Sequence, residues 1–204
     1  QGQECLTLLE SRNDGILDKA IDTVLAYDDV GNPLKFKYSK YDRLLSPTTL
    51  RYVKVASDLN ILFGQELGNV SEIGCGYGGQ ALVNDELLNV ESARLFDLPF
   101  VNELIDRYLN TQLLNGKYET TVINKENATC CDLVISNCAF SELPKRLQKT
   151  YIDKVLSKAE RGYLTMNSGM GNDRSIGKFS LNELRTLLPE FSVIAEEPLT
   201  GDYN

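Results

Sequence analysis

Histidine is absent from this chain of 204 residues. Because histidine is the side chain most often used as a general base near neutral pH, any base must be Asp, Glu, Tyr, Lys, Cys or a bound water. Cysteine is also sparse: there are five, an odd number, and no two are spaced as a CxxC pair. These features argue against zinc sites of the common Cys/His kinds and against a disulfide framework, and we assign no metal ligand.

Positively charged residues are fewer than negatively charged ones. The chain has 21 Lys and Arg against 29 Asp and Glu, a net charge of -8, so it would repel a phosphate backbone, and we expect no nucleic-acid substrate. No window approaches the roughly 20 consecutive apolar residues that a bilayer-spanning helix needs, and no basic-then-apolar signal segment opens the chain. With cysteine used as intracellular proteins use it, the sequence predicts a cytoplasmic protein.

The first part of the chain is typical of helices joined by a polar loop. Apolar residues at helical spacing within 4–25, with a polar break at 11–15, predict two short helices. The segment 27–41 is polar and aromatic and carries Gly31 and Pro33. We expect it to be either a loop over the body of the domain or a plain linker.

Ser46 followed by Pro47 predicts the start of a longer helix. A serine cap before a proline at the first helical position satisfies the free backbone amides without needing a donor at that position. We expect this helix to run to about Phe63 and to end at Gly64 and Gly68.

After residue 68 the pattern changes to short β-rich runs that alternate with helical ones. The expected strands are 70–73, 93–96, 118–123, 132–136, 162–166 and 191–195, and the expected helices are 80–88, 100–110, 143–159 and 181–188. Such alternation implies right-handed crossovers and a mostly parallel sheet. The predicted fold class is α/β, a doubly wound Rossmann-like sheet with helices on both faces. A helical and loop extension over 1–68 would pack on a core of 69–204 as one compact domain.

The strongest signal is a strand that runs into a glycine-rich turn and then a helix, over 70–79 (VSEIGCGYGG). Glycine is needed where the backbone takes a positive φ or where a ligand touches it. Asp97 follows Gly76 by 21 residues, after the second β-run. In a doubly wound sheet this places a carboxylate at the neighbouring strand end, within reach of the two hydroxyls of a bound ribose.

Two adenosine cofactors suit this arrangement, because Gly74, Gly76 and Gly79 also satisfy the GxGxxG dinucleotide pattern of NAD enzymes. S-adenosylmethionine is favoured by Glu72, whose charge near the turn suits a methionyl ammonium and repels a pyrophosphate. The turn lies about a third of the way along the chain, and only 67 residues follow Asn137, too few for the separate substrate domain of many dehydrogenases. A glycine turn that merely closes a βα unit is the alternative without a ligand.

Three strings in order resemble motifs of the class I S-adenosylmethionine-dependent methyltransferases: 72–79, then 96–99 (FDLP) and 132–137 (DLVISN). Within that superfamily, 136–143 (SNCAFSEL) and 161–168 (RGYLTMNS) resemble the bacterial sugar O-methyltransferases, and 46–52 (SPTTLRY) fits the same group. The chain departs from the superfamily after 191–195, where it ends within nine residues. We therefore expect the usual seventh, antiparallel strand to be missing or truncated.

The resemblance implies a cofactor site for S-adenosylmethionine. The backbone of the turn would cradle the methionine portion, at Gly74, Cys75, Gly76 and Gly78. Asp97 would bind the ribose and Leu98 would flank the adenine. Asn137, at the end of the fourth strand, would face the methyl donor. Glu126 or Asn127 could lie at the edge of the adenine, or the pair could form an ordinary turn.

Methylation of a hydroxyl requires removal of its proton as it attacks, which asks for a base or a metal-bound alkoxide. The candidate bases are Glu142 after the fourth strand, Asp173 in the loop 167–175, and Tyr77 in the glycine turn. Glu142 could instead serve the amides at the start of the following helix.

The loop 167–175 follows the fifth strand at the edge of the sheet where ligands bind. We expect it to be a substrate lid, with Arg174 available for an anionic group, or else a surface loop. The function predicted is methyl transfer to a sugar or another small hydroxyl acceptor. The alternatives are an S-adenosylmethionine-binding module without catalysis and an NAD-dependent oxidoreductase.

Overall fold

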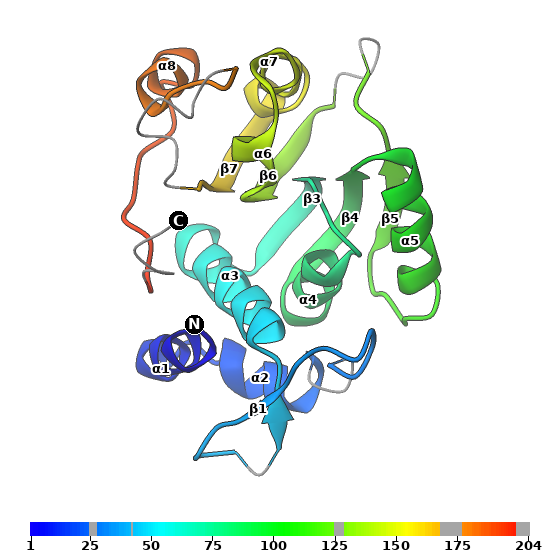
Figure 1. Ribbon diagram of the computed structural model, residues 1–204, viewed down its shortest axis with the longest axis vertical. Coiled ribbons are helices and arrows are strands. Elements are labelled where there is room, and N and C mark those ends of the chain that lie inside the picture. The colour runs from blue at the N-terminus through cyan, green and yellow to red at the C-terminus, as the bar shows by residue number, and fades with distance from the viewer. Residues whose placement is uncertain (25–27, 42, 125–128, 168–176, 199–204) are drawn as a thin grey trace.

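A computed structural model describes residues 1–24, 28–41, 43–124, 129–167 and 177–198 of the chain. Its main sheet has five strands in the order β5-β4-β3-β6-β7, and every neighbouring pair is parallel (Figure 1). The strands are β3 (Glu66–Ile73), β4 (Asn89–Phe96), β5 (Lys117–Thr121), β6 (Cys131–Asn137) and β7 (Ala159–Thr165). Strand order reverses between β3 and β6, so the crevice of this doubly wound sheet lies at the carboxyl end of β3.

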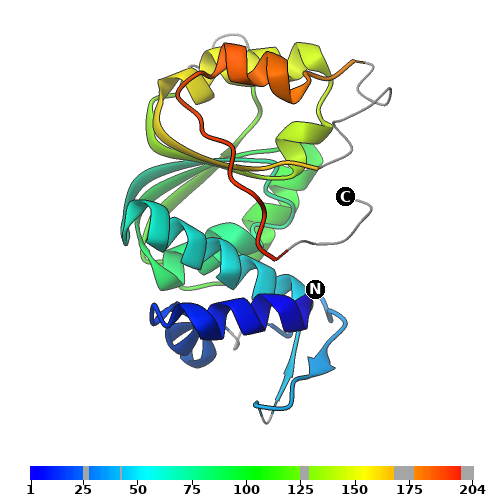
Figure 2. The ribbon, with the colours of Figure 1, turned by 90° about the vertical axis from the view of Figure 1, so that its left-hand side faces the viewer.

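Helices cover both faces of the sheet, as Figure 2 shows. One face carries α3 (Pro47–Phe63), α4 (Gly79–Leu87) and α5 (Pro99–Leu109), and the other carries α7 (Lys145–Lys154) and α8 (Leu181–Leu187). Neighbouring residues of β6 point to opposite faces, so Ile135 packs with the α3 side and Val134 with the α7 side. Both are fully buried, as expected for a strand inside a parallel sheet.

The start of α3 forms as the sequence predicts. The Ser46 hydroxyl accepts from the amide of Thr48 at 3.2 Å, and Pro47 occupies the first turn. The buried carboxylate of Asp28 accepts from the Ser46 amide and the Thr49 hydroxyl, which fixes the chain at this point. The helix ends at Gly64, whose φ of 79° is favourable for glycine.

Two shorter helices, α1 (Gly2–Arg12) and α2 (Ile16–Asp22), precede α3 and confirm the predicted pair. They pack on α3, and their apolar side chains share one buried cluster with residues of β3 and β6. The predicted boundary between residues 68 and 69 falls inside β3, so this strand belongs to both predicted parts. We retain the extension only as a proposal.

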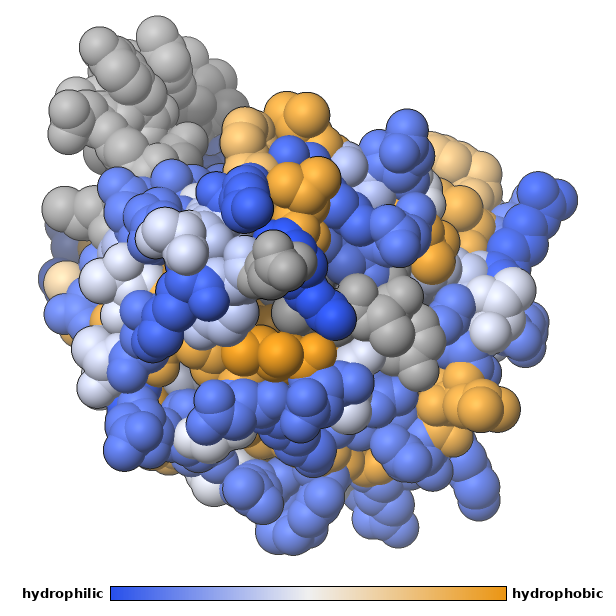
Figure 3. Space-filling model, turned by 90° about the horizontal axis from the view of Figure 1, so that it is seen from below, coloured by the Kyte–Doolittle hydropathy of each residue, from blue (hydrophilic) through white to orange (hydrophobic). Residues whose placement is uncertain are grey.

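Between α2 and α3 the chain forms a small hairpin, in which β1 (Phe36–Lys37) pairs antiparallel with β2 (Leu44–Leu45). Tyr38 is buried against the first turn of α1, beside Gly2, so the segment is attached to the body of the protein. Seen from below, the surface is mainly hydrophilic, and its hydrophobic side chains lie in separate groups (Figure 3).

The prediction of a sixth strand over 191–195 is wrong, because these residues form no strand. The segment after α8 runs toward α3 across the direction of the strands (Figure 2), so it cannot pair with β7. Phe191 instead packs on Gly162 of β7, where a Cβ would lie 2.2 Å from its ring. No antiparallel strand joins the main sheet in the described ranges.

The expected single helix 143–159 is also corrected. The structure has a short α6 (Ala139–Glu142), then α7, then a 3₁₀ turn over Leu156–Lys158. Pro144 stands just before α7. The residue ahead of a proline disfavours the helical region of backbone conformation, and this break separates α6 from α7. Among the described helices, none combines the length and the apolar character needed to cross a bilayer.

Candidate active site

The glycine turn lies at the carboxyl end of β3, at the crevice of the sheet. It closes through a hydrogen bond from the Gly78 amide to the Cys75 carbonyl, and the Gly74 amide donates to Phe96 at the end of β4. The φ angles of Gly74, Gly76 and Gly78 are 75°, 58° and 92°, all in the region that favours glycine. The turn is therefore tied to the neighbouring strand before α4 begins.

Gly74 and Gly76 have different reasons to lack a side chain. A Cβ on Gly74 would lie 2.1 Å from the Cβ of Ala139, so this position is closed by α6. A Cβ on Gly76 would have no protein atom within 4 Å, and the residue is exposed. Packing explains the first glycine, whereas open space beside the second leaves room for a ligand against the backbone.

Asp97 lies beside this open space, where the sequence placed it. Its Oδ2 accepts from the amides of Cys75 at 2.8 Å and Gly76 at 3.2 Å, and its Oδ1 accepts from the Leu98 amide at 2.8 Å. A carboxylate held by three backbone amides is fixed in position and still has free lone pairs. It can accept further hydrogen bonds from hydroxyl groups.

Glu72 is buried one residue before the end of β3, with 3% of its surface exposed. Burial, and then the nearby charge of Asp97, raise the pKa of Glu72 to about 8. A carboxyl group with this pKa is largely protonated at neutral pH, and a cation brought next to it would favour its charged form.

Asn137 ends β6, across the crevice from the turn. The buried side chain of Gln80 donates its Nε2 to the Tyr52 carbonyl and to Asn84, so its Oε1 faces Asn137 and accepts from Nδ2 at 3.3 Å. This arrangement leaves Oδ1 of Asn137 as a buried acceptor with no partner in the described chain. Such an atom is costly unless a ligand donates to it.

Glu142 lies on the same edge of the sheet, at the end of α6. Its Oε1 accepts from Nδ2 of Asn167 at 2.7 Å, and the Asn167 amide donates to the Ser141 hydroxyl at 3.1 Å. The side chain is exposed, and among the described residues it accepts from Asn167 rather than from an amide of α7. Glu142 thus joins the chain after β7 to the chain after β6.

Backbone strain accompanies this junction. Cys138 has a φ of 66°, unusual for a residue with a side chain. Its amide donates to the backbone of Thr165, and its carbonyl accepts from the Ser141 hydroxyl. Non-glycine residues in this region cluster at functional sites, because the surrounding structure must hold them there.

Tyr77 is poorly suited to the role of base. Its ring packs edge-on against Tyr108 at 5.0 Å between centroids and lies 6.3 Å from Tyr52. Burial, followed by the neighbouring tyrosines, raises the pKa of Tyr77 well above its ordinary value. A phenol that is harder to ionise is more rarely present as the phenolate at neutral pH, so we place Tyr77 after the carboxylates as a candidate base.

The structure describes part of the side of the crevice that we expect to hold an adenine ring. Leu98 is 53% exposed, and it follows Asp97 directly at the start of α5. Asn102 is buried nearby, donating Nδ2 to the Thr121 carbonyl at 2.9 Å while its Oδ1 has no partner among described residues. Glu126 and Asn127, like Asp173 and Arg174 of the expected lid, lie outside the described residues.

Sequence reasoning missed three residues of this site. Gln80, Tyr52 and Asn102 act through contacts between elements, and no motif marks them. Only the position of Gln80 directly after the turn could have drawn attention to it.

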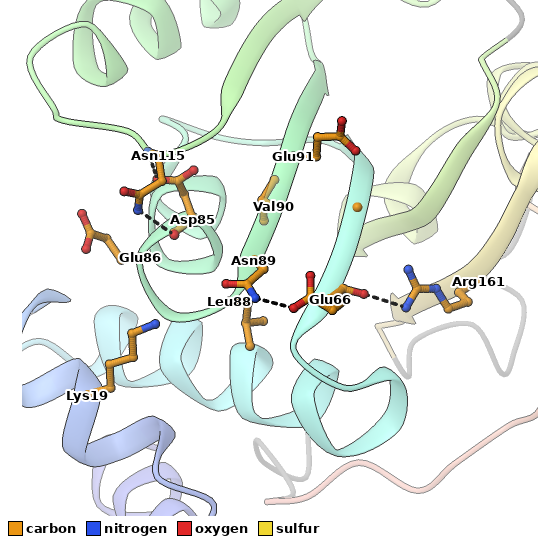
Figure 4. Close-up of a pocket in the computed structure, with 11 residues that line it drawn as sticks. Lys19, Glu66, Asp85, Glu86, Leu88, Asn89, Val90, Glu91, Asn115 and Arg161 are labelled. Atoms are coloured by element: carbon orange, nitrogen blue, oxygen red, sulfur yellow. Dashed lines mark hydrogen bonds between the residues drawn. The ribbon is translucent and has the colours of Figure 1, made fainter.

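A groove of about 570 Å³ lies at the opposite, amino-terminal edge of β3 and β4 (Figure 4). Two of its charged side chains already have partners: Asp85 accepts from the amides of Asn115 and Gly116, and Arg161 donates to backbone carbonyls. Ligands of doubly wound sheets bind at the carboxyl ends instead. No cluster of His, Cys, Asp or Glu placed to hold a metal ion occurs in the described ranges.

A scan against protein-family models and a search of curated proteins gave no match. Solved structures do resemble the chain. A candidate sarcosine dimethylglycine methyltransferase from Galdieria sulphuraria has a TM-score of 0.54 and 17% identity, over 82% of this chain and 72% of that one. Magnesium protoporphyrin IX methyltransferase from Synechocystis, with bound SAH, has a TM-score of 0.53 and 16% identity, over 70% and 72%. An O-methyltransferase family protein from Burkholderia thailandensis has a TM-score of 0.51 and 12% identity, over 71% and 51%.

At these identities the resemblance shows the fold. The five parallel strands with helices on both faces form a Rossmann-like sheet, the fold of these solved structures, and the predicted α/β class is confirmed.

Proposed function

We propose that the chain is an S-adenosylmethionine-dependent methyltransferase that methylates a hydroxyl group of a small acceptor such as a sugar. The observation that carries the proposal is the position of the Asp97 carboxylate beside the open face of Gly76. The carboxylate is fixed by backbone amides and retains lone pairs for the two hydroxyls of a ribose, while the exposed backbone of Gly76 has room for the ligand.

The same contacts disfavour a dinucleotide. A pyrophosphate bound at a glycine turn uses the free amides of that turn. Here the amides of Cys75 and Gly76 already donate to Asp97, and Glu72 adds a second acid beneath the turn. The Asp97 carboxylate, together with a buried acid that a neighbouring cation would ionise, favours a cationic ligand over a diphosphate.

The methionine end of the cofactor is matched by two acceptors. Its ammonium group would lie near Glu72, whose charged form it stabilises, and near the unpartnered Oδ1 of Asn137. When bound, the cofactor supplies an electrophilic methyl group on a positively charged sulfur. The chain has no new negative charge to stabilise at the leaving group, so positioning supplies most of the rate.

We propose Glu142 as the base that takes the proton from the attacking hydroxyl. Its carboxylate lies at the carboxyl edge of the sheet, and its bond from Asn167 leaves the second oxygen available. Asp173 remains a second candidate.

Calorimetry with S-adenosylmethionine and S-adenosylhomocysteine tests the cofactor assignment. Asp97→Ala should weaken binding by roughly 1.5 to 3 kcal/mol, because it removes a charge-assisted contact to two hydroxyls. A variant with Glu119→Ala, an exposed acid on β5, is the control. Equal affinity of Asp97→Ala and the parent chain would refute the assignment, and NADH fluorescence that rises on binding would favour the dinucleotide.

The acceptor is tested by incubating the parent chain with a radiolabelled methyl donor and a panel of saccharides. Transfer to a sugar hydroxyl supports the proposal. Tight binding of the cofactor with no transfer to any hydroxyl or amine acceptor would indicate a binding module without catalysis.

A further inference from the structure

We infer that the outer surface of α5 binds the same surface of a second copy of this chain. Four exposed residues form this surface, which we call the α5 face: Phe100, Glu103, Leu104 and Arg107. The inference does not rest on the proposed function, because it concerns the packing of α5 and not the cofactor.

The helical period divides α5 into a buried and an exposed side. Its buried residues are three or four positions apart and face the body of the protein: Asn102, Ile105 and Leu109. Phe100 and Leu104 are also four positions apart, but they lie on the opposite side and are 68% and 51% exposed. A surface helix ordinarily carries polar residues there. Neighbouring exposed apolar side chains, unlike single ones, mark an interaction site.

The position of α5 leaves this surface accessible. The helix packs on β5, the strand at one margin of the sheet, and no other described helix or strand lies beyond it (Figure 1). Leu98, just before α5, and Leu113, in the loop just after it, are 53% and 88% exposed. Apolar side chains are therefore exposed along the helix and at both of its ends, over roughly 16 Å of helix at 1.5 Å per residue.

The charges of the α5 face favour a second copy as the partner. Glu103 and Arg107 are exposed and four positions apart, and in the described ranges neither takes part in an ion pair. If two such helices pair antiparallel about a two-fold axis near residue 105, Glu103 of each copy lies opposite Arg107 of the other. The two Leu104 side chains then meet near the axis. The face is complementary to itself, which is what a two-fold symmetric interface requires.

The size of the α5 face predicts how tightly the copies associate. One helix of 11 residues from each copy makes an interface at the low end of the specific ones. We therefore expect a dimer that forms at micromolar rather than nanomolar concentrations.

Sedimentation equilibrium from about 1 to about 300 μM tests the association. The parent chain should dimerise over this range. Leu104→Glu should weaken the association roughly 10-fold or more, because two carboxylates would meet at the centre of the interface. Leu34→Glu, which changes a leucine that is 75% exposed ahead of β1, is the matched control and should dimerise like the parent. Circular dichroism checks that each variant is folded.

A second experiment tests the antiparallel pairing itself. Glu103→Arg and Arg107→Glu should each weaken self-association, because each change places like charges opposite one another twice in the dimer. A mixture of these two variants should form a heterodimer with an affinity near that of the parent, since every acid again meets a base. The double variant should self-associate like the parent for the same reason.

Four results would overturn the inference. A parent chain that stays monomeric over the whole range has no such interface, and a dimer that Leu104→Glu leaves intact uses another surface. A mixture of the single variants that does not restore association excludes the antiparallel pairing. Binding of a different protein by a monomeric parent chain, lost in Leu104→Glu, would assign the α5 face to that protein. Each of these results leaves the proposed function unaffected, because none measures cofactor binding.

Discussion

Glu72 is a buried acid whose ionisation should govern both stability and cofactor affinity. Its pKa of about 8 in the folded protein exceeds the ordinary 4.5, so the folded chain keeps a proton that the unfolded chain releases. The contribution of Glu72 to the free energy of unfolding is fully present below pH 4.5 and is lost as the pH rises through 8. The methionyl ammonium favours the charged form, so cofactor affinity should rise over the same range.

The measurement is the free energy of unfolding from pH 5 to 8.5 for the parent chain and for Glu72→Gln. The parent chain should lose on the order of a few kcal/mol relative to Glu72→Gln, at about 1.4 kcal/mol for each pKa unit. Glu142→Gln, which changes an exposed acid, is the matched control. Parallel curves for parent and Glu72→Gln would mean that Glu72 is charged in the folded protein.

Glu142 is expected to contribute to turnover rather than to cofactor binding. Replacing it with Gln keeps the hydrogen-bonding shape toward Asn167 but removes the proton acceptor, so turnover should fall about 100-fold or more. Cofactor affinity, measured by calorimetry, should stay at the parent value. Turnover at the parent rate would make Glu142 a structural link between the ends of β6 and β7, and Asp173 would become the candidate to test.

At the scale of elements, two glycines of the turn between β3 and α4 have different roles. Gly74 is required by the packing of the fold, and Gly76 leaves room for a ligand. Gly74→Ala should destabilise the protein, because the new Cβ would lie 2.1 Å from that of Ala139, and the added change Ala139→Gly should restore much of the loss. Thermal unfolding of the two single variants and the double variant measures this. No rescue in the double variant would assign the cost to backbone conformation, since the φ of Gly74 is 75°.

Gly76→Val should behave in the opposite way. It meets no protein atom, so the fold should survive with a modest cost of about 1 to 2 kcal/mol for a φ of 58°. Cofactor binding should be abolished, because the branched side chain fills the ligand's space. A folded Gly76→Val variant, checked by circular dichroism, that binds S-adenosylmethionine normally would exclude this turn as the cradle.

These elements also show which parts of the fold and site could be predicted from the sequence and which could not. The five strands and the start of α3 could be predicted, because apolar runs and a Ser-Pro cap act locally. The segment 191–195 has a strand-like composition, yet its course is decided by the packing of Phe191 on Gly162. For the same reason Gln80 and Tyr52 could not be predicted as members of the site, since their contacts join residues 28 positions apart.

At the scale of the whole molecule, Asp58 connects the N-terminal helices to the sheet. It pairs with Arg12 of α1 and Lys54 of α3, and it accepts from the Tyr163 hydroxyl of β7 at 2.5 Å. Asp58→Asn should cost about 3 kcal/mol, because it leaves two largely buried cations without a charged partner. The loss in the free energy of unfolding is measured by chemical denaturation, with the transition followed by two spectroscopic probes.

The same variant tests whether residues 1–68 unfold with the rest of the chain. One shared transition in both parent and Asp58→Asn would support a single compact domain. Separate transitions, with α1 to α3 lost first, would make the N-terminal part an independent unit. Tyr163→Phe removes only the hydroxyl and should have a smaller effect, about 1 to 2 kcal/mol.

The crosswise course of the chain after α8 has a consequence for self-association. β7 is the margin of the main sheet, and in the described ranges its ladder is made with β6 alone. An open margin of this kind is a template onto which an extended strand of another molecule can add. Phe191, seated on Gly162, holds a segment across that margin without pairing to it. In the described ranges this segment therefore acts as a steric shield beside β7, and we expect it to limit the addition of a strand from another molecule.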